Sequence, residues 1–487
     1  MAKEWTSWND HGTFKPRLRS AATNVIDARW VLKWKIVDGV KTVKARLCVR
    51  GFKDREADHV VTSASTAARW TQRMVVSMAA NHGWKISLAD VGTAFLRGLT
   101  FQEIAKMTGE KPREVCIDPP RGSWKFLATF PCMRGCSITT HVLALLKGVY
   151  GLKDAPRAWR IKLDIVLKKL GAIPLKSDPC LYMWHDKRDT LCCIASTHVD
   201  DLKMAGKEEE VKRIIAGLEK EVGTLKKESG SFEHCGIMHR QLDNGDIVIH
   251  QNHYTPNLMA LNIPKEAKLE SFCGDTDIAA YMSLLGGVAW VVNTRAEIAI
   301  FVGALQRVAK TPKYIDMKRL NTVLRFMKKH PMETIFKKLT GPLKIIAVSD
   351  SAFKRQDESP LACRGSMTLL CSSNYSELGG HVHILDYECK KQKRVTRSTY
   401  GAELHGLADS MEGTRVIACA LTELYEGAKT FGQLSRLEDE GKYHFPIEAC
   451  LDAKSVYDSI VHADLKTPEE KSLMNILGQM RENMSTT

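Results

Sequence analysis

The fold of this chain is decided by residues 191–204, which read LCCIASTHVDDLKM. An apolar run precedes a polar turn, and Leu202 and Met204 alternate with polar residues after it. This pattern predicts two β-strands joined by a tight turn that carries Asp200 and Asp201. Because adjacent carboxylates repel each other, we expect this turn to lie where water or a cation offsets the repulsion.

A second acidic strand end lies upstream. Residues 84–90 (WKISLAD) form a short apolar run that ends at Asp90. Hard divalent ions such as Mg²⁺ bind carboxylate oxygens together with substrate phosphates. Two such ions, about 3.5–4 Å apart, can activate a primer hydroxyl and stabilise a leaving pyrophosphate in one displacement. The acids are compatible with polymerase chemistry, although an acidic turn alone is more typical of a solvated loop.

Five stretches spread over about 160 residues follow one family pattern in order. They are residues 44–52 (KARLCVRGF), 88–96 (LADVGTAFL), 146–159 (LKGVYGLKDAPRAW), 177–182 (SDPCLY) and 198–201 (HVDD). Together they resemble the reverse transcriptase of copia-type (Pseudoviridae) LTR retrotransposon Pol polyproteins. The resemblance implies an RNA-directed DNA polymerase with a right-hand fold of fingers, palm and thumb, the palm being of split βαβ type.

The resemblance also implies the metal ligands. Asp90, Asp200 and Asp201 would be the catalytic carboxylates, with Asp90 and Asp200 as the direct ligands of two Mg²⁺ ions, for which Mn²⁺ is an alternative. The substrates would be an RNA template, a DNA primer and deoxynucleoside triphosphates.

Four further residues take substrate-binding roles by position. Lys44 and Arg46 would approach the triphosphate, where an arginine fork fits phosphate oxygens. Phe95 would lie under the sugar and exclude a ribose 2′-hydroxyl. From the residues alone, a solvated basic face and a core aromatic stay open as alternatives. Asp154 stands where the family has Gln, so Lys153 or a metal would have to compensate its charge.

A second acidic set follows in residues 348–353 (VSDSAF), 390–403 (KKQKRVTRSTYGAE) and 451–455 (LDAKS). These stretches resemble the family's ribonuclease H domain. That resemblance implies that Asp350, Glu403 and Asp452 hold two Mg²⁺ ions and cleave the RNA strand of an RNA–DNA hybrid. The basic run would track phosphates. Without the resemblance, the spacing of these residues would be equally compatible with three unrelated surface carboxylates.

The pattern of elements divides the chain into three parts. We expect reverse transcriptase fingers and palm over residues 1–225, thumb and connection over 226–340, and a mixed α/β ribonuclease H-like domain, truncated at its C-terminus, over 341–487. The overall class is α/β and α+β. Finer expectations are a β-rich start over the first ninety residues, a helix within 143–172, an amphipathic helix over 208–225, helices over 281–329 with breaks near Gly286 and Pro312, several short strands up to about Val395, a helix from Ser398 and Thr399, and a helical stretch over 469–484.

Composition narrows the class of partner. With 71 Lys and Arg against 56 Asp and Glu, the net charge of +15 favours a polyanion as the partner.

The 14 cysteines are scattered, and Cys132, Cys136 and His141 lack a fourth zinc ligand at a suitable spacing, so we expect free thiols in a reducing compartment. No apolar run could span a membrane. We expect a cytoplasmic particle that later reaches the nucleus, with other polyprotein products as partners.

Three departures from the family leave an alternative open. His198 replaces the usual Tyr, Asp154 replaces Gln, and the family's fourth ribonuclease H Asp has no counterpart before Thr487. A catalytically decayed remnant that only binds nucleic acid or protein is therefore the second hypothesis. A DNA-templated polymerase with an unrelated acidic pair is the third, and residues 150–159 argue against it.

Overall fold

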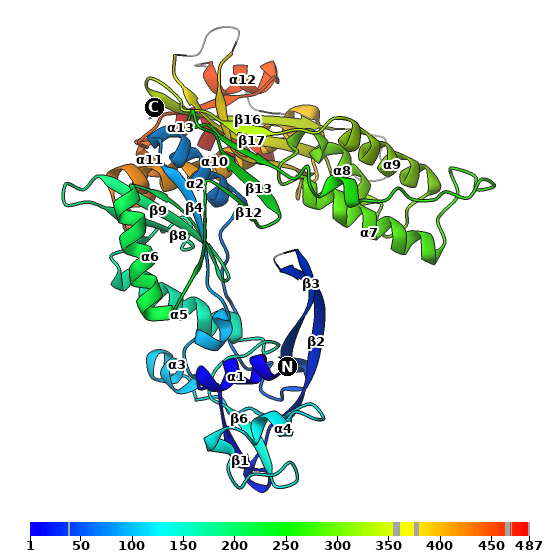
Figure 1. Cartoon of the computed structure of the whole chain (residues 1–487). Coiled ribbons are helices and arrows are strands. Elements are labelled where there is room, and N and C mark those ends of the chain that lie inside the picture. Colours follow the sequence, from blue (N-terminus) through cyan, green and yellow to red (C-terminus); the bar gives the residue numbers. More distant parts are fainter. Residues whose placement is uncertain (38, 354–360, 375–378, 463–467, 469, 486–487) are drawn as a thin grey trace.

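The computed structural model describes residues 1–37, 39–353, 361–374, 379–462, 468 and 470–485. Within these ranges the chain has a mixed α/β architecture with four β-sheets. The N-terminal sheet lies at one end of the molecule and the C-terminal sheet near the other (Figure 1). A group of three helices projects sideways from the end that holds the C-terminal sheet (Figure 1).

The first sheet has the strand order β1-β6-β5-β2-β3. Its strands are β1 (Phe14–Leu18), β2 (Val25–Val37), β3 (Val40–Val49), β5 (Cys116–Asp118) and β6 (His141–Leu145). Strands β2 and β3 continue beyond the sheet as a long antiparallel hairpin (Figure 1). The expected β-rich start also contains two helices, α1 (Ala2–Asp10) and α2 (Arg69–His82). Helix α1 forms because Trp5 and Trp8, three residues apart, both bury their rings on one helical face.

The second sheet carries the acidic hairpin and has the order β11-β4-β10-β9-β8-β7. Its strands are β4 (Lys85–Asp90), β7 (Ile173–Pro174), β8 (Leu181–His185), β9 (Leu191–His198), β10 (Asp201–Gly206) and β11 (Lys226–Ser229). Helices α5 (Ala155–Lys169) and α6 (Glu208–Val222) pack on one face, and α2 packs on the other. The predicted hairpin and both predicted helices are confirmed.

The third sheet, β12-β13-β14-β15, joins the sideways helices to the rest. Its strands are β12 (Ser231–His234), β13 (Ile237–Gln241), β14 (Ile247–His250) and β15 (Thr334–Phe336), and the helices are α7 (Asp275–Val291), α8 (Ala299–Arg307) and α9 (Tyr314–Lys329). The predicted break near Pro312 is confirmed. The predicted break near Gly286 is wrong, because buried Leu285 and Val288 anchor α7 on both sides of a glycine that costs only about 1 kcal/mol.

The fourth sheet, β18-β17-β16-β19, is mixed, because β16 and β19 run parallel. Its elements are β16 (Leu343–Ala352), β17 (Cys363–Ser372), β18 (Val382–Lys391), β19 (Ile447–Cys450), α10 (Thr399–Glu426), α11 (Phe431–Glu440), α12 (Lys454–Val461) and α13 (Met474–Ser485). The predicted start of α10 is confirmed, since the Ser398 side chain accepts a hydrogen bond from Gly401 N at 3.1 Å. The strands up to Lys391 are ten residues long rather than short, because each pairs along its whole length.

The remaining short helices are α3 (Phe101–Thr108) and α4 (Trp124–Leu127). None of the helices in the described ranges is both long and apolar enough to cross a bilayer.

Helix α2 is shared by two halves of the molecule. It packs on β9 and β10 and also on β18, so residues on every side of it are buried, Met74 and Met78 completely. One apolar cluster continues from this helix through the second sheet into the C-terminal sheet and α10. The hydrophobic core therefore crosses residue 340 without interruption.

Candidate active sites

The first acidic site lies at one end of the second sheet. In the antiparallel register of β4 and β10, Asp201 stands directly opposite Asp90. Directly opposed residues point to the same face of a sheet. Asp200 precedes β10 on the turn, and its carbonyl accepts a hydrogen bond from Val91 N at 3.0 Å. The fold thus brings together three aspartates that are 110 residues apart in the sequence.

The turn that carries Asp200 is held in a strained conformation. Val199 has a φ of 58°, a left-handed value that is unfavourable for a β-branched side chain. The indole N–H of Trp159, on the buried face of α5, donates to the Val199 carbonyl at 2.7 Å. Sequence reasoning placed Trp159 on a helix face but missed this bond, because no spacing rule links a helix to a turn 40 residues later.

Charge coupling connects the three carboxylates. Burial and the neighbouring Asp200 and Asp90 raise the pKa of Asp201 to about 7. Burial and Asp90 also raise the pKa of Asp200, whereas Arg46 lowers it. Lys226 stands opposite Asp90 in the β11–β4 strand pair, and its charge lowers the pKa of Asp201. Asp200 is therefore influenced from the side of the β2–β3 hairpin and Asp201 from the side of β11.

Lys44 and Arg46 lie on one face of β3, two residues apart and both exposed. Partial desolvation and Arg46 lower the pKa of Lys44, and Asp90 opposes this shift. The Arg46 guanidinium lies 4.9 Å from the ring centroid of Tyr150, and the Phe95 ring lies 5.4 Å from the same centroid. Tyr150 thus connects the predicted triphosphate-binding and sugar-binding side chains. Its position within residues 146–159 was the only sequence feature that could have pointed to it.

Two glycines allow the backbone at the end of the β2–β3 hairpin to pack closely against the segment that carries Tyr150. A Cβ atom at Gly151, whose φ is +101°, would lie 2.1 Å from the Val49 carbonyl oxygen, and one at Gly51 would lie 2.1 Å from the Gly151 oxygen. Val49 N donates to the Tyr150 carbonyl at 2.8 Å. Residues 44–52 and 146–159 therefore act as one structural unit.

The expected compensation of Asp154 by Lys153 is wrong. Asp154 is buried and forms an ion pair with Arg113 at 2.5 Å, and Arg113 also binds Asp54. The Lys153 ammonium instead lies 3.4 Å from the exposed Asp58 carboxylate. A buried carboxylate needs a cation with several donors, which the guanidinium provides. The substrate-binding role of Lys153 stays a prediction.

The second acidic site joins three elements of the C-terminal domain. Val348 and Cys450 are partners in the parallel pair β16–β19, and Asp350 and Asp452 each follow two residues later. Glu403 comes from the first turns of α10 and accepts a hydrogen bond from Ser351 N at 3.2 Å. Ligand oxygens of the three acids lie within 4.8 Å of one another.

The chemistry of this triad fits a divalent cation. Glu403 is only 5% exposed, and its Oε2 atom is buried without a hydrogen-bond partner. Burial, Asp350 and Asp452 raise the pKa of Glu403 to about 7. A buried carboxylate oxygen that faces two more carboxylates is stabilised by a metal ion, for which oxygen ligands of this kind are suited. The ion's identity is not determined by the side chains.

The two sites differ in compactness. Among the described residues, the C-terminal triad forms a group whose ligand atoms all lie within 4.8 Å, and the aspartates of the second sheet do not form such a group.

The family follows from comparison with known proteins. Residues 18–261, about half of the chain, match the family model described as reverse transcriptase (RNA-dependent DNA polymerase). The chain belongs to this family.

The relatives within it confirm the predicted copia-type Pol resemblance. The chain is 25% identical over 418 residues to the retrovirus-related Pol polyprotein from transposon RE2 of Arabidopsis thaliana, covering 83% of this chain and 26% of that protein. It is 25% identical over 433 residues to the Pol polyprotein from transposon TNT 1-94 of Nicotiana tabacum, covering 83% and 30%. The chain thus spans less than a third of the length of these relatives.

A solved structure, a foamy viral protease–reverse transcriptase in complex with double-stranded DNA, is similar at 10% identity and a TM-score of 0.46, covering 91% of this chain and 68% of that one.

Proposed function

We propose that this chain is an RNA-directed DNA polymerase of a copia-type retrotransposon, with a ribonuclease H domain attached. The single observation that carries the proposal is the alignment of Asp201 opposite Asp90, with Asp200 on the adjoining turn and influenced by Arg46. Membership of the reverse transcriptase family supports the polymerase part.

In this proposal the second sheet is the palm, the first sheet with its hairpin is the fingers, and helices α7, α8 and α9 belong to the thumb and connection. Separate apolar clusters within residues 1–225, 226–340 and 341–487 support the three-part division, and the cluster around α2 joins the parts.

The chain's own residues would act on substrate as follows. Asp90 and Asp200 would hold the catalytic Mg²⁺ or Mn²⁺ ions, which would supply activation of the primer hydroxyl and stabilisation of the leaving pyrophosphate. Lys44 and Arg46, whose charges act on Asp90 and Asp200 from β3, would bind the triphosphate. Phe95, held against Tyr150, would exclude a ribose 2′-hydroxyl.

The C-terminal triad would cleave the RNA strand of the hybrid. Asp350, Glu403 and Asp452 would hold the metal, and the exposed basic residues Lys391, Lys393, Arg394 and Arg397 would bind backbone phosphate. The partners are then an RNA template, a DNA primer and their hybrid, inside a cytoplasmic particle that later enters the nucleus.

Primer extension on an RNA template tests the polymerase part. The unaltered chain should incorporate deoxynucleotides, and Asp200→Asn should not, while Asp243→Asn, an exposed carboxylate between β13 and β14, should retain activity. Background incorporation by all three proteins would reject the proposal in favour of a decayed remnant that only binds. Extension of a DNA template alone would favour a DNA-templated enzyme.

The structure weakens one argument for decay. Asp154, which departs from the family's usual residue, forms a buried ion pair with Arg113. The charge of Asp154 is therefore partly compensated inside the protein by an arginine that Asp154 shares with Asp54.

A further inference from the structure

Two cysteines meet on neighbouring strands of the C-terminal sheet, the edge strand β18 and the adjacent strand β17. Cys363 begins β17, and Cys389 lies near the end of β18. In the antiparallel register Cys389 pairs with Gly365, so Cys363 is its diagonal neighbour. Their Sγ atoms are 3.8 Å apart. A disulfide bond is about 2.05 Å long, so side-chain rotation must close a gap of somewhat less than 2 Å.

The surroundings of this pair favour reaction. Both cysteines are part-exposed, and both line a cavity of about 240 Å³ that Asp350 also lines. Reactive thiols in proteins are typically part-exposed and close to positive charge. Arg307, at the end of α8, supplies that charge. The shared S–H···S contact with Cys389, together with Arg307, lowers the pKa of Cys363, whereas burial and Asp350 act in the opposite direction.

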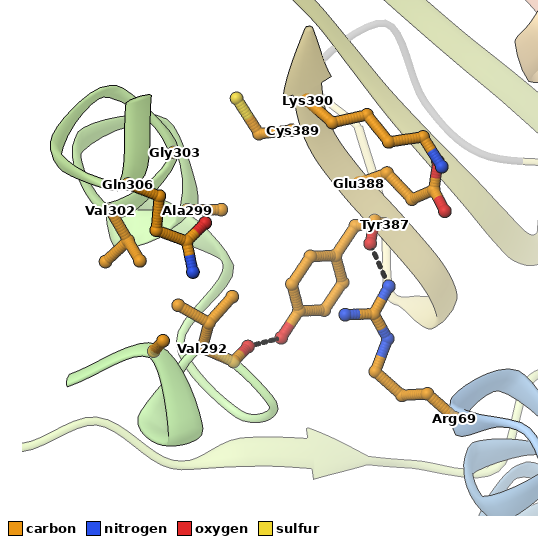
Figure 2. A pocket seen from close by; sticks show the side chains of 11 residues that line it. Arg69, Val292, Ala299, Val302, Gly303, Gln306, Tyr387, Glu388, Cys389 and Lys390 are labelled. Atoms are coloured by element: carbon orange, nitrogen blue, oxygen red, sulfur yellow. Dashed lines mark hydrogen bonds and ion pairs between the residues drawn. The ribbon is translucent and has the colours of Figure 1, made fainter. Parts of the chain in front are cut away.

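The pair also lies at a junction between two parts of the chain. Gly303 of α8 packs against Cys389, because a Cβ atom there would lie 3.4 Å from the Cys389 carbonyl oxygen and 3.9 Å from its sulfur. Figure 2 shows Cys389 on β18 beside the helix that carries Gly303 and Gln306. The cavity whose lining residues are drawn there, of about 210 Å³, is also lined by Cys389.

We propose that Cys363 and Cys389 form a redox-active dithiol, which a hydroperoxide oxidises to an intramolecular disulfide across β17 and β18. Their proximity, their exposure to a cavity and the neighbouring Arg307 carry the proposal. The disulfide would join β18 to β17 close to Gly365, the strand partner of Asp350, which lies two positions from Cys363. The proposal of a redox-active dithiol does not depend on the polymerase and ribonuclease H assignments.

The oxidation proceeds in two steps. The Cys363 thiolate attacks one oxygen of hydrogen peroxide, the O–O bond breaks, and hydroxide leaves a cysteine sulfenic acid behind. Cys389 then attacks that sulfur, the S–O bond breaks, and the disulfide forms. The two sulfurs give up two electrons in total, and with the two thiol protons the peroxide becomes two molecules of water. A dithiol reductant reverses the change.

Differential alkylation of the full chain tests the proposal. The protein is treated with dilute hydrogen peroxide, alkylated with N-ethylmaleimide, reduced, and alkylated with iodoacetamide before peptide mass spectrometry. We expect the Cys363 and Cys389 peptides to carry the second label after peroxide and the first label without it. The adjacent buried pair Cys192 and Cys193 serves as a control that should not change. N-ethylmaleimide on Cys389 after oxidation of Cys363 would overturn the proposal.

Three variants sharpen this test. Cys389→Ser should leave Cys363 as a sulfenic acid that dimedone traps, with no disulfide. Arg307→Gln should slow disulfide formation several-fold, whereas Arg325→Gln, an exposed arginine on α9, should not. Equal rates in the two arginine variants would remove the electrostatic part of the argument, and a disulfide that forms in the Cys389→Ser variant between Cys363 and another cysteine would overturn the pairing.

Discussion

The two acidic sites of this chain use the same functional group in different ways. In the second sheet, three aspartates lie on two strands and one turn, and their repulsion is partly balanced by Arg46 and Lys226. In the C-terminal domain, three acids from two strand ends and a helix converge within 4.8 Å, and one buried oxygen has no partner. The comparison teaches that the acids of the first site are balanced by neighbouring basic side chains, whereas those of the second are close enough together to hold a cation.

The largest expected effects come from removing one acid from either site, which should abolish one activity and leave the other unchanged. Asp90→Asn should lower nucleotide incorporation by at least about 10³-fold, equivalent to about 4 kcal/mol of transition-state stabilisation, because a charged metal ligand is lost. Asp350→Asn should have the corresponding effect on hybrid cleavage. Each variant should leave the other activity within about two-fold, as expected for distant sites. Primer extension and a labelled-hybrid cleavage assay measure both, and loss of both activities in either variant would contradict the separation.

The next effect concerns how the first site is held together. Gly151→Ala should lower the free energy of unfolding by at least about 3 kcal/mol, because the new Cβ would collide with a backbone oxygen as well as strain a left-handed residue. Gly245→Ala is the matched control, since its φ of +89° is similar but the space around it is open. It should cost about 1–2 kcal/mol. Equal losses in chemical denaturation would show that the close approach has no role.

A third effect is a pH dependence at the junction between the halves. His383 on β18 is 1% exposed, binds Ser77 of α2 at 2.8 Å and the Lys337 carbonyl at 2.6 Å. Burial lowers its pKa to about 4, so the unfolded chain binds more protons than the folded chain between about pH 4 and 6.5. Stability should therefore be intact above about pH 6.5 and fall by about 2 kcal/mol by pH 5.

Denaturation of the His383→Gln variant checks this assignment. The variant should lose that part of the pH dependence, while His253→Gln, an exposed histidine, should keep it. An unchanged profile in His383→Gln would assign the effect to other groups.

The smallest effect separates metal binding from stability at the compact site. The pKa of the Glu403 carboxyl is raised to about 7, so its ionised form destabilises the folded protein at pH 8 when no metal is bound. Because Glu403→Gln removes that charge, the variant should be more stable in the presence of EDTA at pH 8 by about 1–2 kcal/mol. It should also lose the increase in melting temperature that Mg²⁺ or Mn²⁺ produces. Glu412→Gln, exposed on the same helix, should change neither quantity. A metal-dependent shift that persists in Glu403→Gln would contradict the site.

Local sequence patterns were sufficient to predict several features. The hairpin around Asp200, the helix after residue 155 and the start of α10 follow from alternation, helical spacing and a capping serine. The convergence of the acids was implied only by family resemblance, because Asp350 and Asp452 meet through a parallel strand pairing that no local pattern encodes.

Other features depend on contacts between distant segments. Arg113 lies in a stretch without a motif, yet it forms the ion pair with Asp154. Tyr150 is one aromatic among several, and its contacts with Arg46 and Phe95 depend on the crossing of Gly51 and Gly151. Helix α2 falls within the stretch that was expected to be β-rich, and the pattern did not indicate a helix because its polar residues Thr71, Arg73 and Ser77 are buried together with its apolar ones.

The all-round burial of helix α2 has a practical consequence for anyone dividing the chain. A recombinant fragment that stops near residue 340 would lack β18. It would therefore expose Met74, Met78 and the other side chains that this strand and its sheet cover. Such a fragment should be prone to aggregation. The piece beginning at residue 341 would have the complementary exposed apolar surface, so co-expression of both pieces is the natural route to a soluble split protein.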